Sequence, residues 1–168
     1  IFDKYEGYQP TCLVYSNYGG THGEIDAAHA LQVSCNYFFY DIGDRMKIDI
    51  IDRTAKALGL GEKTGVELQE YTGWRANEET KAKFYDADGA VWSLGDQLAA
   101  SIGQSDNMFT PAQLASYVCT ILNKGKRYSL RLVDEVVDYD TGEVVHKKES
   151  ELLSDNPISD STLEAVKD

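Results

Sequence analysis

The chain contains little of what marks several common protein classes. Its 168 residues include only three cysteines, three prolines and two methionines, and basic side chains are scarce, with 16 against 28 acidic ones. The formal charge of −12 argues against a surface that binds nucleic-acid phosphates or anionic lipid, so we expect no nucleic-acid partner. No apolar run is long enough to cross a bilayer, and neither end has the pattern of a signal peptide.

Cysteine and histidine usage indicates neither a disulfide framework nor a metal site. The residues concerned are Cys12, Cys35, Cys119, His22, His29 and His146. Three cysteines without a C-x-x-C are too few for a disulfide scaffold. The histidines show no metal-ligand spacing, and nothing in the sequence brings Cys35 to a histidine as a thiol–imidazole pair. We therefore expect a buried structural Cys35, no metal and no organic cofactor.

The composition is that of an ordinary globular chain. Hydrophobic residues make up 42% and charged residues 26%, which is enough to bury a core, and the length suits one domain or part of one. The chain has no initiator methionine and ends soon after a helix start at Ser159 or Asp160. We therefore expect residues 1–168 to be part of a larger domain, with no second domain.

The first half of the chain predicts extended segments followed by helices. Residues 1–24 are rich in Tyr and Gly, with one β-prone run at "CLVY". Asp26 can cap a short helix through Val33. A second helix follows the triplet "SCN", and a third is predicted between an N-cap at Asp49 and a C′ glycine at Gly59.

The second half predicts a loop, a strongly marked helix and a hairpin. Residues 75–92 are polar, with a possible short helix. Thr110 and Gln113 form a capping box around Pro111, and the helix ends at Gly125. Its predicted apolar stripe is Leu114, Tyr117, Val118, Ile121 and Leu122. A hairpin near 130–146 turns at Asp140-Thr141-Gly142, so the fold class is α+β, mainly helical.

Ser34 and Asn36 are the candidate site residues. In an extended connector, residues two apart project to the same side, so both would face one cleft while Cys35 turns to the core. A hydroxyl and a carboxamide together can relay a proton and bind a peptide amide. Ser-x-Asn also occurs by chance, and both residue types often cap helices.

Two other motifs favour structural interpretations. Lys63-Thr64-Gly65 follows turn material rather than a β-prone run, so we expect a solvated turn instead of an active-site strand. The segment Gly103–Ser105 lacks the glycine spacing of a phosphate loop, and a tight turn before the next helix is the simpler interpretation.

Three blocks in order carry a family resemblance: "GGTHGEIDAAHALQVSCNYFFYDIGDRM", "ALGLGEKTGVEL" and "IGQSDNMFTPAQLASYVCTILNKGKRY". They resemble the transpeptidase domain of class B penicillin-binding proteins, nearest to the elongation-type, cell-shape-maintaining members. The resemblance covers roughly residues 5 to 137. Two departures are Ser105, where many members have Gly, and "LQEY", where Leu-Pro-Gly-Glu is more usual.

The resemblance implies roles for Ser34 and Asn36. In that family, Ser-x-x-Lys with the nucleophile, Ser-x-Asn and Lys-Thr-Gly line one cleft. "SCN" matches the second motif, so Ser34 would move protons and Asn36 would bind the stem-peptide amide. No Ser-x-x-Lys lies upstream of Ser34, and the only Lys-Thr-Gly precedes the helix that it should follow. The resemblance thus implies an internal fragment that is itself inactive.

The implied parent is a serine D,D-transpeptidase that cross-links peptidoglycan stem peptides through an acyl-enzyme and is inhibited by β-lactams. Its implied setting is the extracytoplasmic face of a bacterial membrane, with a membrane-anchored parent, a soluble fragment and elongation-machinery proteins as partners. A β-lactam sensor, a D,D-carboxypeptidase or a β-lactamase of the same fold remain alternatives, as does a non-enzymatic interaction domain.

Overall fold

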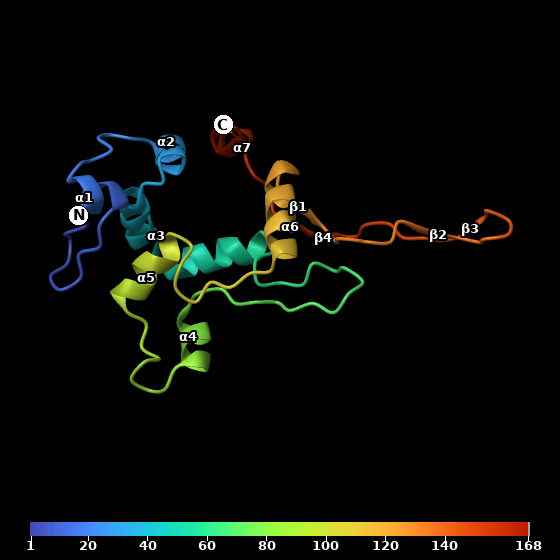
Figure 1. Ribbon diagram of the computed structural model, residues 1–168, viewed down its shortest axis with the longest axis horizontal. Coiled ribbons are helices and arrows are strands. Elements are labelled where there is room, and N and C mark those ends of the chain that lie inside the picture. The colour runs from blue at the N-terminus through green and yellow to red at the C-terminus, as the bar shows by residue number, and fades with distance from the viewer. Residues whose placement is uncertain (168) are drawn as a thin grey trace. The chain divides into compact units, whose positions relative to one another are not determined.

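The computed structural model describes residues 1–167 as a mixture of helices and short strands, in agreement with the predicted α+β class (Figure 1). The helices are α1 (Leu13–Tyr18), α2 (Ala27–Gln32), α3 (Asn36–Ala57), α4 (Glu78–Phe84), α5 (Leu94–Ser101), α6 (Pro111–Leu122) and α7 (Asp160–Lys167). The strands are β1 (Lys126–Tyr128), β2 (Glu135–Val137), β3 (Val144–Lys147) and β4 (Leu152–Asp155). The predicted C-terminal helix begins as expected, with Ser159 as its cap, while Asp168 lies outside the described residues.

The chain divides into two compact units. The first unit contains residues 1–54 and 74–107, together with the chain end from Ala165. The second unit contains residues 55–73 and 108–164. Within residues 1–167, no helix combines the length and the hydropathy needed to cross a membrane.

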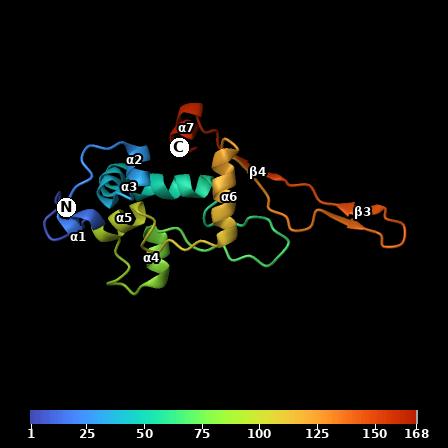
Figure 2. The same cartoon turned by 45° about the horizontal axis from the view of Figure 1, so that its top comes forward.

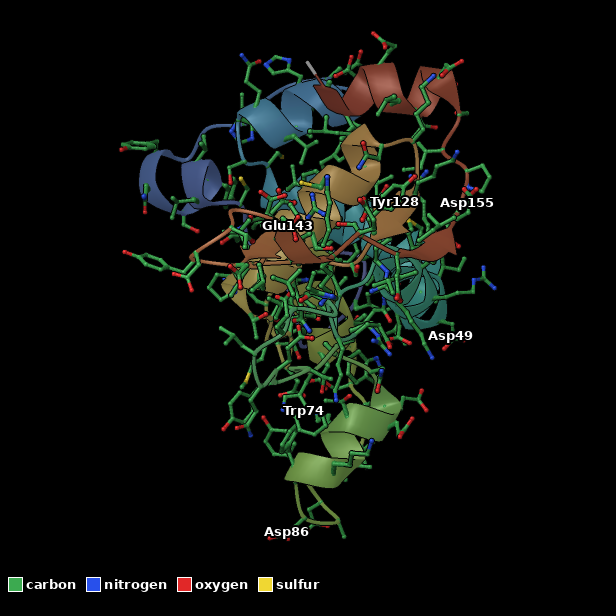
Figure 3. The ribbon with its side chains drawn as sticks, turned by 90° about the vertical axis from the view of Figure 1, so that its right-hand side faces the viewer. Asp49, Trp74, Asp86, Tyr128, Glu143 and Asp155 are labelled. Carbon is green, nitrogen blue, oxygen red and sulfur yellow. The ribbon has the colours of Figure 1, made fainter. Side chains whose placement is uncertain are left out.

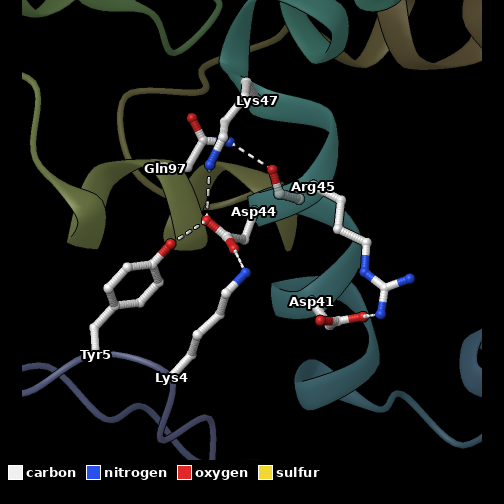
Figure 4. Close-up of polar contacts among 8 residues, drawn as sticks. Lys4, Tyr5, Asp41, Asp44, Arg45, Lys47 and Gln97 are labelled. Carbon is white, nitrogen blue, oxygen red and sulfur yellow. Dashed lines mark hydrogen bonds and ion pairs between the residues drawn. The ribbon is translucent and has the colours of Figure 1, made fainter.

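Three small buried clusters form the core of the first unit. They are Phe2 with Tyr40 and Leu98, Cys12 with Ala30 and Cys35, and Ile48 with Ala76 and Ala100. Helices α3 and α5 approach closely at Gly43, where an added Cβ would lie 2.2 Å from the Ser101 Cβ. The Gln97 Nε2 atom donates to the Gly43 carbonyl at 2.8 Å (Figure 4). Gly43 therefore weakens the helix locally but permits this packing.

The helices of the first unit follow the sequence signals in part. The Asp26 side chain accepts from the His29 N–H and caps α2, which confirms that prediction. The predicted N-cap at Asp49 lies two residues too late, because α3 consists of two helices that join at a kink at Lys47. The break lies at Lys47, whose φ of 62° and ψ of 161° are not helical, and whose ammonium pairs with Asp44. Gly59 has a φ of 92° just beyond the end of α3, as predicted.

Two elements of the first unit differ from expectation. The predicted β-prone run at "CLVY" lies in helix α1 instead, because Cys12 stays extended as the N-cap and Gly19, at a φ of 64°, closes the helix. Helix α5 was not predicted at all. Its signal was present, since Ser93 and Asp96 form a reciprocal capping box.

The loop predicted at 75–92 contains its short helix, α4, which Asn77 caps through the Thr80 N–H. The Trp74 ring packs edge-on against Phe84 with the centroids 4.8 Å apart. Figure 3 shows Trp74 beside α4 and Asp86 at the tip of the loop that follows this helix. The start of the predicted loop is therefore anchored by packing and capping.

In the second unit, α6 has the predicted capping box of Thr110 and Gln113. The predicted apolar stripe, however, is wrong as a buried face. Its members Leu114, Val118 and Leu122 are 47%, 50% and 54% exposed. The buried face carries Gln113, Ser116 and Thr120.

Two antiparallel strand pairs complete the second unit. Strand β1 pairs with β4, and β2 pairs with β3 to form the predicted hairpin, which turns at Gly142 with a φ of 70°. Figures 1 and 2 show the β2–β3 ribbon projecting beyond the β1–β4 pair. The β1–β4 pairing was not predicted, because its strands are three and four residues long and lie 23 residues apart.

Candidate functional site

The junction between α2 and α3 carries the two predicted site residues. The Ser34 N–H donates to the Leu31 carbonyl at 3.2 Å, and the Cys35 N–H donates to the Ala30 carbonyl at 2.9 Å. Ser34 has a φ of 52°, in the left-handed region that side chains other than glycine rarely adopt. The predicted extended connector is therefore wrong, since a tight hydrogen-bonded turn joins the helices. Such strained positions concentrate at functional sites.

Ser34 and Asn36 nevertheless lie on the same hollow. Its volume is about 260 Å³, and its lining residues are Leu31, Ser34, Asn36, Phe39, Ser101 and Ile102. All of these residues belong to the first unit. The Ser101 hydroxyl donates to the Leu98 carbonyl at 2.6 Å, so its proton is already used. Ser34 and Asn36 are the other two polar lining residues, and each has a side chain that can both donate to and accept from a ligand.

The hollow presents one hydroxyl and one carboxamide from the α2–α3 junction. Ser34 is exposed and Asn36 is partly exposed, whereas Cys35 between them is buried, 5% exposed. Burial raises the pKa of Tyr40, and a hydrogen bond with Asn36 lowers it, which places the Asn36 side chain near that phenol. A hydroxyl able to pass a proton thus stands beside a carboxamide able to bind an amide.

The other side of the same segment faces a second hollow of about 590 Å³. There the ligand atoms of Cys12, His22 and Cys35 all lie within 4.8 Å of one another. The Cys12 Sγ and His22 Nδ1 atoms are 3.8 Å apart. The expectation that nothing brings histidine to the cysteines is therefore wrong for His22. No local motif predicts this group, because its members come from three segments that only the tertiary fold brings together.

The donor set suits a soft or borderline divalent ion such as Zn²⁺. Two sulfurs bound to one tetrahedral zinc lie about 3.8 Å apart, so small side-chain shifts would close the group on an ion. Thiolate and imidazole ligands match this metal class. Asp3, Glu24 and Asp41 line the same hollow and offer carboxylates.

The Cys12 thiol has an environment that favours its ionised form. Burial alone raises the pKa of Cys12. The backbone N–H groups of Val14, Asn36 and Tyr37 and the Cys35 thiol lower it, and the net shift is downward. A thiolate is the form that binds metal.

Lys63-Thr64-Gly65 lies outside the strands, as predicted, but the predicted solvated turn is wrong at Thr64, which is buried. Glu70 accepts from the Thr64 N–H at 2.8 Å and the Gly65 N–H at 2.9 Å, and also from the Thr64 hydroxyl. Thr64 is 1% exposed. Burial raises the pKa of Glu70, but these hydrogen bonds lower it by more, so the net shift is downward. The Glu70 carboxylate therefore holds this segment in place. The threonine hydroxyl is thus engaged in the fold.

Comparison with known proteins places the chain in context. Residues 2–168 match the family model for the penicillin binding protein transpeptidase domain. The peptidoglycan D,D-transpeptidase MrdA of Salmonella typhimurium is 32% identical over 106 residues, which are 62% of this chain and 16% of MrdA. Stage V sporulation protein D of Bacillus subtilis is 29% identical over 149 residues, 88% of this chain and 21% of that protein.

A solved structure agrees with these relatives. The penicillin-binding protein PBP2 of Helicobacter pylori matches with a TM-score of 0.66 and 27% identity, over 86% of this chain and 25% of PBP2. The chain thus spans about a sixth to a quarter of the length of these relatives. Because the family model matches nearly every residue, the chain belongs to the penicillin-binding protein transpeptidase domain family.

Proposed function

We propose that this chain is part of a serine D,D-transpeptidase that cross-links peptidoglycan stem peptides and is acylated by β-lactams. The observation that carries the proposal is the shared hollow of Ser34 and Asn36 at the α2–α3 junction. The chain belongs to the transpeptidase domain family, whose Ser-x-Asn motif the pair matches, and one relative is named a peptidoglycan D,D-transpeptidase. No alternative of the same fold is favoured by a separate observation.

In this proposal, Ser34 and Asn36 of the Ser-x-Asn motif have different roles. Ser34 passes protons between the serine nucleophile and the leaving or attacking amine. Asn36 binds a backbone amide of the donor stem peptide, so the scissile carbonyl is held for attack. The turn between α2 and α3 is hydrogen-bonded, so it holds the Ser34 and Asn36 side chains in position before a ligand binds.

The nucleophile must come from outside these 168 residues. The only serine before Ser34 is Ser16, and Gly19 stands three positions later where the family motif requires lysine. Removal of a nucleophile abolishes nearly all turnover in serine acyl-transfer enzymes. We therefore propose that the isolated chain is inactive and that the longer protein carries the activity.

The proposed cellular location and partners rest on the family and on one solved relative. The H. pylori relative has been solved in a complex with MreC. We propose that the longer protein is anchored to a bacterial membrane, acts on its extracytoplasmic face and assembles with proteins of the elongation machinery.

The test uses the longer protein and a fluorescent penicillin. Ser34→Ala should lower the acylation rate constant by about 100-fold or more, the usual scale of acid–base catalysis. Asn36→Ala should weaken penicillin binding as well as acylation, because it removes a contact to the bound amide. Ser150→Ala, in an exposed loop, is the matched control and should acylate normally.

Two results would overturn the proposal. Ser34→Ala and Asn36→Ala could both acylate at the control rate, in which case neither side chain plays a role in acylation. Alternatively, the 168-residue chain could itself be labelled stoichiometrically, in which case the nucleophile lies inside it. Product analysis with a D-Ala-D-Ala peptide and an amine acceptor then separates transpeptidation from simple hydrolysis.

A further inference from the structure

Two parts of the first unit build the hollow that Ser34 and Asn36 line. One part is the end of α2 with the start of α3, and the other is the end of α5. The first part supplies Leu31, Ser34, Asn36 and Phe39, and the second supplies Ser101 and Ile102. The separation of α3 and α5 therefore decides the width of the hollow.

Gly43 sets this separation. It is buried in α3, and a Cβ added to it would lie 2.2 Å from the Ser101 Cβ and 2.7 Å from the Ser101 Oγ. Carbon atoms in contact prefer about 3.5–4.0 Å, so a side chain at Gly43 would push the two helices apart by about 1 Å or more. The Ser101 Cα would be 3.6 Å away, an ordinary contact. The clash therefore involves the Ser101 side chain and not its backbone.

Gln97 holds the same contact from α5. It lies four residues before Ser101, so both side chains are on one face of the helix. Gln97 is 6% exposed, and its Nε2 atom donates to the Gly43 carbonyl at 2.8 Å (Figure 4). Two successive turns of α5 thus meet one residue of α3.

The contact at Gly43 lies on the same face of α3 as the hollow. Asn36, Phe39 and Gly43 are three and four residues apart, so they follow one side of the helix. The first two line the hollow, and the third meets α5. The kink of α3 at Lys47 lies beyond all three. The helix therefore connects the Gly43 contact to Asn36 without a break.

We propose that Gly43 is a positioning residue for the acylation site, because it sets how far the end of α5 lies from Ser34 and Asn36. Gln97 holds that distance. The catalytic consequence rests on the proposed function, whereas the structural one does not. A misplacement of about 1 Å away from the chemistry can slow an enzyme about 100-fold. A wider hollow would let a bound peptide or penicillin move relative to the Ser34 hydroxyl.

The first experiment measures acylation of the longer protein by saturating fluorescent penicillin, at a temperature where each variant is folded. Gly43→Ala should lower the acylation rate constant about tenfold or more. In a Ser101→Gly background the same change should cost about twofold or less, because the clashing Cβ and Oγ atoms are gone. Gln97→Met removes the hydrogen bond without crowding the helices, so it should slow acylation by less than Gly43→Ala does.

The second experiment measures melting temperatures of the same variants, which report on the contact independently of the chemistry. Gly43→Ala should lower the melting temperature of the wild type. In the Ser101→Gly background it should raise the melting temperature, because alanine is a better helix former than glycine once the clash is absent. The change of sign is specific to a contact between these two positions.

Ile48→Val is the matched control for general loss of stability. Ile48 is buried on the same helix but packs in a separate cluster with Ala76 and Ala100. The variant should lower the melting temperature and leave the acylation rate constant unchanged. Should Gly43→Ala fail to fold, the comparison of Gln97→Met with Ile48→Val tests the inference in its place.

Three results would overturn the inference. Gly43→Ala could acylate at the wild-type rate, it could be equally slow in the Ser101→Gly background, or Ile48→Val could slow acylation as much. In the replacement comparison, equal acylation by Gln97→Met and Ile48→Val has the same meaning. Failure of the proposed function looks different, because Ser34→Ala would then acylate normally while the change of sign in melting temperature would remain.

Discussion

At the scale of single residues, the buried carboxylate of Asp44 binds two lysines and a tyrosine in the first unit. Its side chain is 1% exposed and accepts hydrogen bonds from Lys4, from Tyr5 at 3.0 Å and from Lys47 at 2.9 Å (Figure 4). Burial raises the pKa of Asp44, but these donors outweigh burial and lower it to about 2. The ion pairs hold the N-terminal segment and the kink at Lys47 on one carboxylate.

We predict a pH-dependent cost for Asp44→Asn. The folded pKa of about 2 lies below the unfolded value of about 3.9, so the stabilisation is complete above that value and disappears as the pH falls through 2. The variant should lose about 2 kcal/mol of unfolding free energy at pH 7, and the difference from wild type should vanish near pH 2. Urea denaturation across this range measures it.

Asp41→Asn is the control on the same helix. Asp41 is 29% exposed and pairs with Arg45, which is 69% exposed, so its loss should cost less than about 1 kcal/mol. A pH-independent difference for Asp44→Asn would contradict the assignment.

Backbone strain gives a second residue-scale prediction. Ser105 has a φ of 65° and Gly103 a φ of 76°, and a Cβ at Gly103 would meet nothing within 4 Å. Ser105→Gly should therefore stabilise by about 0.5–1 kcal/mol, and Gly103→Ala should destabilise by about 1 kcal/mol through strain alone. Thermal unfolding of the two variants and their double mutant measures both, and equal signs would contradict the argument.

At the scale of elements, Gln113 fixes α6 to the loop that precedes it in the second unit. The side chain is 1% exposed, and its Nε2 atom donates to the Glu62 and Thr72 carbonyls at 2.7 Å each. Its Oε1 atom accepts from the Thr110 N–H. One amide therefore satisfies two loop carbonyls and the helix cap at once.

Gln113→Leu should cost about 2–4 kcal/mol, because it removes a buried amide that hydrogen-bonds to two loop carbonyls and to the helix cap. Leu114→Ala, the next residue and 47% exposed, should cost less than about 1 kcal/mol. Chemical denaturation of both variants gives the comparison. Similar costs at the two positions would show that α6 packs through its apolar face instead.

The group formed by Cys12, His22 and Cys35 leads to a prediction about metal. The reduced chain should bind about one Zn²⁺, measurable by calorimetry and by a colorimetric zinc assay after acid release. His22→Ala should weaken binding, and a chelator should lower the melting temperature of wild type more than that of this variant. Cys119→Ala, which lies outside the group, should bind as wild type does. Zinc retained with unchanged affinity in His22→Ala would contradict the assignment.

At the scale of the whole molecule, the second unit exposes an apolar surface. Leu114, Val118 and Leu122 recur four residues apart on α6, and each is about half exposed. Exposed apolar stripes of this kind mark surfaces that are covered by another part of a protein or by a partner. The stripe is consistent with the proposal that the chain is one part of a larger transpeptidase domain.

Val118→Lys should therefore reduce self-association and dye binding of the isolated chain while changing the unfolding free energy by less than about 0.5 kcal/mol. Light scattering and denaturation measure the two effects. Thr120→Lys, on the buried face of the same helix, should instead be strongly destabilising. A large stability loss in Val118→Lys would show that the stripe is part of the core of this chain.

The sequence alone determined the capping box of α6, the cap of α2 at Asp26, the hairpin that turns at 140–142 and the family resemblance carried by three ordered blocks. These depend on local chemistry, since a cap or turn is made by residues a few positions apart. The tertiary structure decided the kink at Lys47, the buried polar face of α6 and the meeting of Cys12, His22 and Cys35. Each of these depends on groups distant in the sequence, such as the loop carbonyls that bind Gln113, and periodicity within one segment contains no information about them.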